Sequence, residues 1–159
     1  MNELGNSEFA AELRRVISAT FGSGKPDPRD EETFVMLFRL LGDLARIDGE
    51  VEQEETALVY TLLGESGASG PLCRRVIEAY RGDASHVALR TELGRYLEVF
   101  PRGSRQVTTM LENLIALAHA DGLLEKEERH FLEELIGWLG IPTEELDSMV
   151  AAVEAPKFE

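Results

Sequence analysis

The amino-acid sequence predicts an all-α fold, a compact bundle of about seven to eight helices with an internal pseudo-two-fold repeat. Apolar residues recur at helical spacing along the chain, and no stretch alternates in polarity over the length of a strand. One pattern also occurs twice, 73 positions apart, as LGDLARIDGEVEQEETALVYTLLG at residues 41–64 and LIALAHADGLLEKEERHFLEELIG at residues 114–137. Each copy contains an apolar helix, an Asp-Gly turn, an acidic run and a second apolar helix. We therefore expect two helix–turn–helix units joined by a linking segment.

Residues 1–22 are the first expected element, an amphipathic helix. Its apolar side chains share one helical stripe, at Phe9, Leu13, Val16, Ile17 and Phe21. Residues 23–30 follow as a loop or linker, because two prolines and a glycine interrupt helical structure there. If this segment is a linker, the first helix is an appendage. If it is a plain loop, the helix belongs to the same domain as residues 31–153, and residues 154–159 form a tail.

The first unit begins with a helix expected over residues 31–46, followed by the Asp48-Gly49 turn. Glu52 lies where the next helix begins and Glu55 lies in its first turn, positions where carboxylates interact favourably with the helix dipole. Gly67 and Pro71 bound the break after this helix.

The linking segment carries a short helix over residues 72–80 and a second helix that Ser85 is placed to cap. The unit then repeats, with Asp121-Gly122 as its turn and Glu125 and Glu128 in the positions of Glu52 and Glu55. Residues 140–143 introduce a last helix.

Charge separates the repeats from the segment that joins them. Residues 41–70 carry seven acidic and one basic side chain, residues 107–159 twelve and three, and residues 71–106 four and seven, within a net charge of −14. Such a chain repels nucleic acid, because nucleic-acid binding depends on neutralising phosphates. Cations and protein partners are better candidates, and homodimer formation is compatible with this pattern.

The duplicated turns carry a pattern with metal chemistry. The spacing D-G-x-[VL]-x-x-x-E coincides with the second half of an EF-hand calcium loop, but Leu44 and Leu117 stand where its first ligand belongs. An EF-hand is therefore not expected. If the two units face each other, they form one acidic cluster, composed of Asp48, Glu52, Glu55, Asp121, Glu125 and Glu128. Oxygen ligands alone suit calcium, magnesium or manganese.

The alternative is a structural role without metal, in which the aspartates bond the amides of their turns and the glutamates cap their helices. An enzyme is not predicted, and we expect neither catalytic nor cofactor-binding residues. The pair Glu127 and His130 has the E-x-x-H spacing of di-iron bundles, but the first copy has Glu54 and Ala57 instead. The sequence lacks a nucleophile–base–orienter set.

Other features set expectations for the location of the protein. Cys73 is the only cysteine, so the chain cannot form an internal disulfide. The sequence contains neither an apolar run of roughly 18 residues nor a signal peptide. We expect a cytoplasmic protein or a fragment of a longer one, without a membrane span, and peripheral membrane association remains open to it.

The paired units, ARIDGEVEQEETALVYTLL and AHADGLLEKEERHFLEELIGWLGI, resemble the TerB-like family, which includes the tellurite-resistance protein TerB and the N-terminal domain of the DjlA co-chaperones. RVIEAYRGDASHVALRTEL resembles the linking region of the DjlA type. The likeness covers residues 31–153. It implies an all-helical bundle, an acidic cluster that involves metal, and a part in stress responses, often near the membrane. Position by position, it implies Asp48, Glu55, Asp121 and Glu128 as site residues.

Two features of DjlA proteins are missing from this sequence, the N-terminal membrane helix and the His-Pro-Asp tripeptide of the J domain. The resemblance therefore implies a binding domain that does not itself stimulate a chaperone ATPase. We predict a scaffold or sensor for tellurite or envelope stress with a divalent cation at the acidic cluster. The alternative is a metal-independent module for protein interaction or self-association, within a co-chaperone fragment.

Overall fold

The computed structural model describes residues 3–21, 27–47, 49, 51–82 and 86–154 of the chain. These residues form eight helices and no strand, which confirms the all-α prediction. The helices are α1 (Glu3–Phe21), α2 (Pro28–Ile47), α3 (Gln53–Glu65), α4 (Gly70–Arg81), α5 (His86–Val99), α6 (Arg105–Ala120), α7 (Lys126–Leu139) and α8 (Thr143–Glu154).

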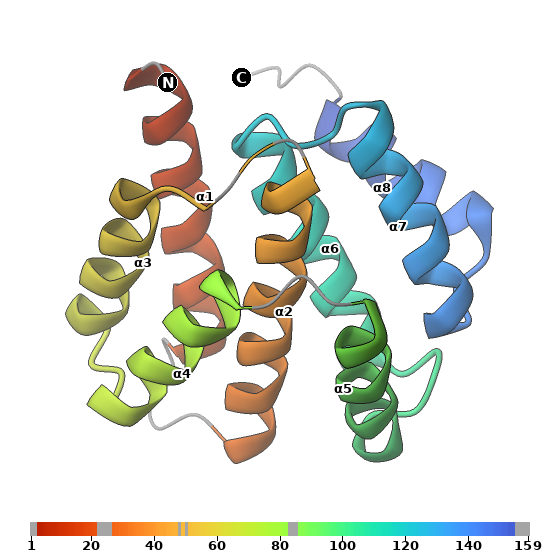
Figure 1. Cartoon of the computed structure of the whole chain (residues 1–159), viewed down its shortest axis with the longest axis horizontal. Coiled ribbons are helices and arrows are strands. Elements are labelled where there is room, and N and C mark those ends of the chain that lie inside the picture. The colour runs from red at the N-terminus through yellow and green to blue at the C-terminus, as the bar shows by residue number, and fades with distance from the viewer. Residues whose placement is uncertain (1–2, 22–26, 48, 50, 83–85, 155–159) are drawn as a thin grey trace.

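The repeat predicted from the sequence appears as two helix pairs, α2 with α3 and α6 with α7. The first helix of each pair lies in the centre of the molecule, where α2 and α6 pack against each other (Figure 1). Their contact surfaces are apolar because leucines recur every three or four residues, and Leu41, Leu44, Leu111 and Leu114 are all fully buried. Each such side chain contributes about 1.5–3 kcal/mol by leaving water.

The remaining helices surround this central pair. α1 packs against α3 and α6, and its Phe9, Leu13 and Val16 are fully buried in the common core. α8 covers α6 and α7 on the other side of the molecule (Figure 1). α4 packs along α2 and α3, while α5 packs against α2. The linking segment is therefore built onto the first helix of the first unit.

Local sequence signals set several helix boundaries. Pro28 is the first residue of α2, where its missing N–H and fixed φ are tolerated. The hydroxyl oxygens of Ser69 and Ser104 accept hydrogen bonds from the third residues of α4 and α6. The expected cap at Ser85 lies outside the described residues. None of the helices in the described part of the chain is both long enough and apolar enough to cross a membrane.

Candidate functional site

The turn of the second unit fixes the position of Asp121 at the end of α6. The amide of Leu123 donates to the carbonyl of Ala118 at 2.7 Å, and the amide of Gly122 donates to that of His119 at 3.1 Å. This pair of bonds is a Schellman motif, which requires a left-handed residue, and Gly122 supplies it with a φ of 76°. Asp121 is thereby held at the C-cap of α6.

The corresponding carboxylates of the first unit lie at the start of α3. Glu52 is the N-cap residue, as the sequence predicted, and its backbone amide donates to Oε1 of Glu55 at 3.2 Å. The Glu55 side chain is buried, with 6% of its surface exposed, while Glu52 is exposed. This capping bond holds Glu55 in one orientation within the first turn of the helix.

The two units meet through these side chains, because Asp121 forms a side-chain hydrogen bond with Glu55. Burial, that bond, and the negative charges of Glu55 and Glu52 together raise the pKa of Asp121 from 3.8 to about 8. Asp121 therefore keeps its proton at neutral pH and donates it to the Glu55 carboxylate. Three of the six carboxylates predicted from the sequence thus interact across the repeat.

Tyr80 brings a third group to this place from α4. Its side chain is fully buried, and its hydroxyl has no hydrogen-bond partner among the described residues. Burial raises the pKa of Tyr80 well above 10, and the negative charges of Glu55, Asp121 and Glu52 raise it further. The hydroxyl therefore stays protonated beside the carboxylates and is available as a hydrogen-bond donor.

Close packing of α4 on α2 determines where Tyr80 lies. A Cβ atom on Gly42 would come within 2.1 Å of the Tyr80 carbonyl oxygen, so the two helices can meet this closely only at a glycine. The same oxygen accepts a bond from Nη1 of Arg46 at 2.8 Å. Sequence reasoning did not assign Tyr80 or Arg46 to the site. The helical periodicity of α4 places Tyr80 in the core, but periodicity does not tell which carboxylates it faces.

The other predicted site residues are Asp48, Glu125 and Glu128. Asp48 lies outside the described residues. Glu125 is the exposed N-cap of α7, and Glu128 is fully buried in the first turn of that helix. His130, the other half of the E-x-x-H pair, has 72% of its side chain exposed and lies near Glu133 and Glu134. It contributes nothing to the buried carboxylates.

The chemistry of the convergent carboxylates fits a hard cation. Two neighbouring carboxyl groups, one of them ionised, relieve their repulsion either by keeping a proton between them or by binding a positive ion. The described residues do not place three acidic, histidine or cysteine side chains around one point. Glu55 and Asp121 instead offer a pair, and magnesium commonly binds through one or two carboxylates while it keeps several waters.

Comparison with known proteins identifies the family. The family model described as tellurite resistance protein TerB matches residues 35–151. The co-chaperone protein DjlA of Vibrio parahaemolyticus is 30% identical over 138 residues, which are 85% of this chain and 48% of that protein. DjlA of Vibrio cholerae is 29% identical over 140 residues, covering 87% and 49%.

DjlA of Aliivibrio fischeri is 28% identical over 135 residues, covering 84% and 48% of the two chains. The chain thus spans about half the length of the curated relatives it matches. No solved structure matches the chain. The family match covers most of the helical bundle, including both Asp-Gly pairs of the sequence together with Glu55 and Asp121, and the chain belongs to the TerB family.

Proposed function

We propose that this chain is a non-enzymatic binding domain of the kind found at the N-terminus of DjlA, a scaffold or sensor in the response to tellurite or envelope stress. A divalent cation regulates it at the carboxylates between the repeats. The observation that carries this proposal is the hydrogen bond that joins one repeat to the other, between the half-buried Asp121, whose pKa is raised, and the buried Glu55. A cation there would replace the proton of Asp121.

In this proposal, Glu55 and Asp121 hold the cation, while Glu52 contributes negative charge nearby. The hydroxyl of Tyr80 donates to a carboxylate or to a cation-bound water. Because Glu55 belongs to α3 and Asp121 to the end of α6, the cation draws the two repeats together. Binding of the cation would thereby change the relative positions of the two repeats, and with them the surfaces that partners contact.

The test is thermal unfolding in EDTA and then in calcium, magnesium, manganese or zinc. A cation at one hundred times its dissociation constant should add about 2.7 kcal/mol to the free energy of unfolding. For a chain of this size, that gain corresponds to a rise in Tm of roughly 5–10 °C. Isothermal titration calorimetry with the same cation gives the stoichiometry, which we expect to be one.

Variants locate the effect, each compared with its own Tm in EDTA. Asp121→Asn and Glu55→Gln should lose the shift, whereas Glu144→Gln, which changes an exposed carboxylate of α8, should keep it. The proposal of a cation site between the repeats is wrong if no cation raises the Tm of the wild-type protein. It is also wrong if Glu144→Gln loses the Tm shift to the same extent as Asp121→Asn and Glu55→Gln.

A metal-independent module for protein interaction or self-association is the second candidate. It is supported by the capping bond between the Glu52 amide and Glu55, which gives that carboxylate a purely structural role. The names of the DjlA relatives also point to protein partners. In this case EDTA leaves the Tm and the molar mass in light scattering unchanged, while the protein still self-associates or binds a partner.

A further inference from the structure

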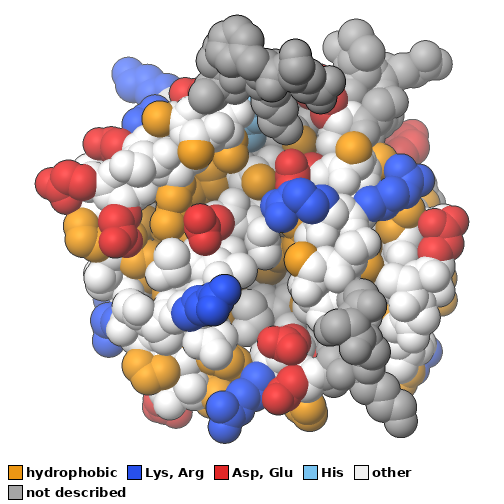
Figure 2. All heavy atoms as spheres, turned by 180° about the vertical axis from the view of Figure 1, so that it is seen from behind, with side chains coloured by type: hydrophobic (Ala, Val, Ile, Leu, Met, Phe, Trp, Pro, Cys, Tyr) orange, Lys and Arg blue, Asp and Glu red, His pale blue; other side chains and the backbone are white. Residues whose placement is uncertain are grey.

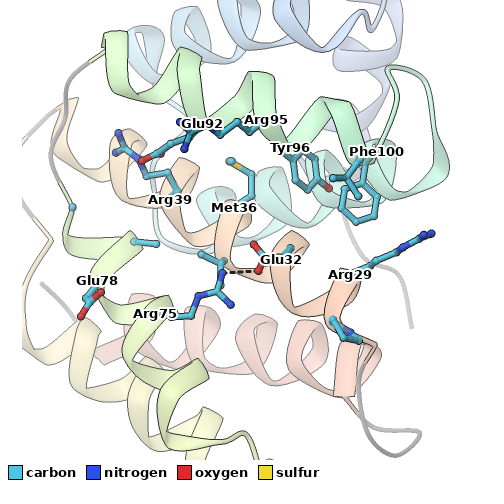
Figure 3. A pocket seen from close by; sticks show the side chains of 15 residues that line it. Arg29, Glu32, Met36, Arg39, Arg75, Glu78, Glu92, Arg95, Tyr96 and Phe100 are labelled. Atoms are coloured by element: carbon cyan, nitrogen blue, oxygen red, sulfur yellow. Dashed lines mark hydrogen bonds and ion pairs between the residues drawn. The ribbon is translucent and has the colours of Figure 1, made fainter.

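A groove of about 720 Å³ opens between α4 and α5, with α2 as its floor (Figure 3). Its apolar surface is formed by Val35, Met36, Ala79, Tyr96, Val99 and Phe100. The Tyr96 and Phe100 rings lie 4.7 Å apart at their centres and line one end, while Met36 lies in the middle. Val99 has 57% of its surface exposed. This volume lies within the range of roughly 300–1,000 Å³ seen for ligand sites.

Charged side chains from all three helices border this apolar surface. They are Arg29, Arg39, Arg75 and Arg95 together with Glu32, Glu78 and Glu92. Nη2 of Arg75 lies 2.7 Å from Oε1 of Glu32, so this ion pair joins α4 to α2. Nε of Arg39 lies 2.7 Å from Oε2 of Glu92, which joins α2 to α5. The walls of the groove are therefore tied to its floor.

Two of the four arginines are left available to a ligand. Arg29 and Arg95 are exposed, and within the described part of the chain neither guanidinium forms an ion pair. Arg29 lies at the Phe100 end of the groove, and Arg95 projects from α5 beside Glu92 (Figure 3). The bordering side chains thus carry more positive than negative charge, in a protein whose net charge is −14.

We propose that this groove binds an acidic amphipathic helix of a partner protein. The apolar stripe of such a helix packs on the exposed Val99 and on the small exposed edges of Met36, Tyr96 and Phe100. Its flanking carboxylates pair with Arg29 and Arg95. A fatty carboxylate has a single charged group, so it would leave one of these two arginines without a partner. The inference rests on the proposed binding role of the domain and is independent of the cation.

The test is selection from a displayed library of helical peptides of about 15 residues, in the presence of EDTA. The selected peptides should repeat large apolar residues at positions i, i+3 or i+4, and i+7, with Asp or Glu beside the stripe. Their affinity, measured by fluorescence anisotropy, should fall at least tenfold for Arg29→Glu combined with Arg95→Glu, and for Val99→Asp. These side chains are exposed, so the variants should keep the wild-type circular dichroism spectrum and Tm.

The matched control is Arg14→Glu, which reverses the charge of an exposed side chain on α1, away from the groove. Its affinity for the peptides should stay within twofold of the wild-type value. The proposal is overturned if the library yields no binder, or if binders tolerate the groove variants. Displacement of the peptides by laurate at a matched concentration would assign the groove to small amphiphilic anions instead. Asp121→Asn should bind the peptides normally, so failure of the cation proposal leaves this result unchanged.

Discussion

Asp121 makes the stability of the protein depend on pH in a direction opposite to that of an ordinary ion-paired carboxylate. Its pKa is 3.8 when unperturbed and about 8 in the folded protein. Between these values the folded state holds a proton that the unfolded chain has released, so the free energy of unfolding falls as pH rises. The whole contribution of this proton to the free energy of unfolding is lost above about pH 8.

We expect Asp121→Asn to flatten this dependence, because the amide still donates to Glu55 and does not ionise. The variant should match the wild type near pH 4 and exceed it by about 1–3 kcal/mol near pH 9, a range that allows for partial exposure of the side chain. Urea unfolding in EDTA at both pH values measures this difference. Asp147→Asn, which removes an exposed ion pair with Arg129, is the control and should retain the wild-type slope. Equal slopes in all three proteins would contradict the assignment.

At this scale, the sequence predicted part of the site. The duplicated motif predicted one cluster of six carboxylates if the two units face each other, and the structure brings Glu52, Glu55 and Asp121 of that set near one another. The motif did not predict Tyr80, whose hydroxyl is placed near the charges of the carboxylates by the packing of α4 over Gly42. Cation binding stays a prediction, and the position of Asp48 lies outside the described residues.

α2 and α4 approach each other closely at Gly42, where an added Cβ would lie nearer to a neighbouring atom than at any other glycine of the described residues. We expect Gly42→Ala to destabilise the protein by about 1–3 kcal/mol or more, because its Cβ would lie 2.1 Å from a backbone oxygen that cannot rotate away. Thermal unfolding of both variants tests this. Gly137→Ala in α7 is the control, since its Cβ would meet nothing within 4 Å, and it should be neutral or stabilising by up to about 1 kcal/mol. Similar losses of unfolding free energy in both variants would show that the close packing of α2 on α4 is not the cause of the destabilisation.

Helices could be predicted from the sequence because their signals are local. Prolines, glycines and apolar periodicity each act within one or two turns, and the helices expected from them lie close to those of the structure. The groove between α4 and α5 was not predicted, although the arginine-rich composition of the linking segment pointed to that region. Its shape depends on the angles at which both helices cross α2, which local signals do not determine.

Over the whole molecule, acidic side chains are spread widely, and the face in Figure 2 shows them interspersed with arginines and lysines rather than gathered in one patch. A net charge of −14 nevertheless gives a general repulsion that opposes the folded state. We expect sodium chloride, raised from low to moderate concentration, to increase the Tm by about 3 °C or more through screening.

Choline chloride should act equally, because screening depends on ionic strength and not on the cation. A Tm that falls with salt would mean that ion pairs such as Arg39 with Asp43, at 2.6 Å and largely buried, outweigh the general repulsion. A rise with sodium alone would instead indicate a monovalent ion site.

The hydrogen bond between Glu55 and Asp121 also bears on how the two units can diverge. Repeated segments within one chain can ordinarily accumulate substitutions separately, since a change in one copy leaves the other intact. Here one copy supplies the donor and the other the acceptor. A substitution at either position therefore removes the partner of the other, and we expect these two positions of the gene to vary together among homologues.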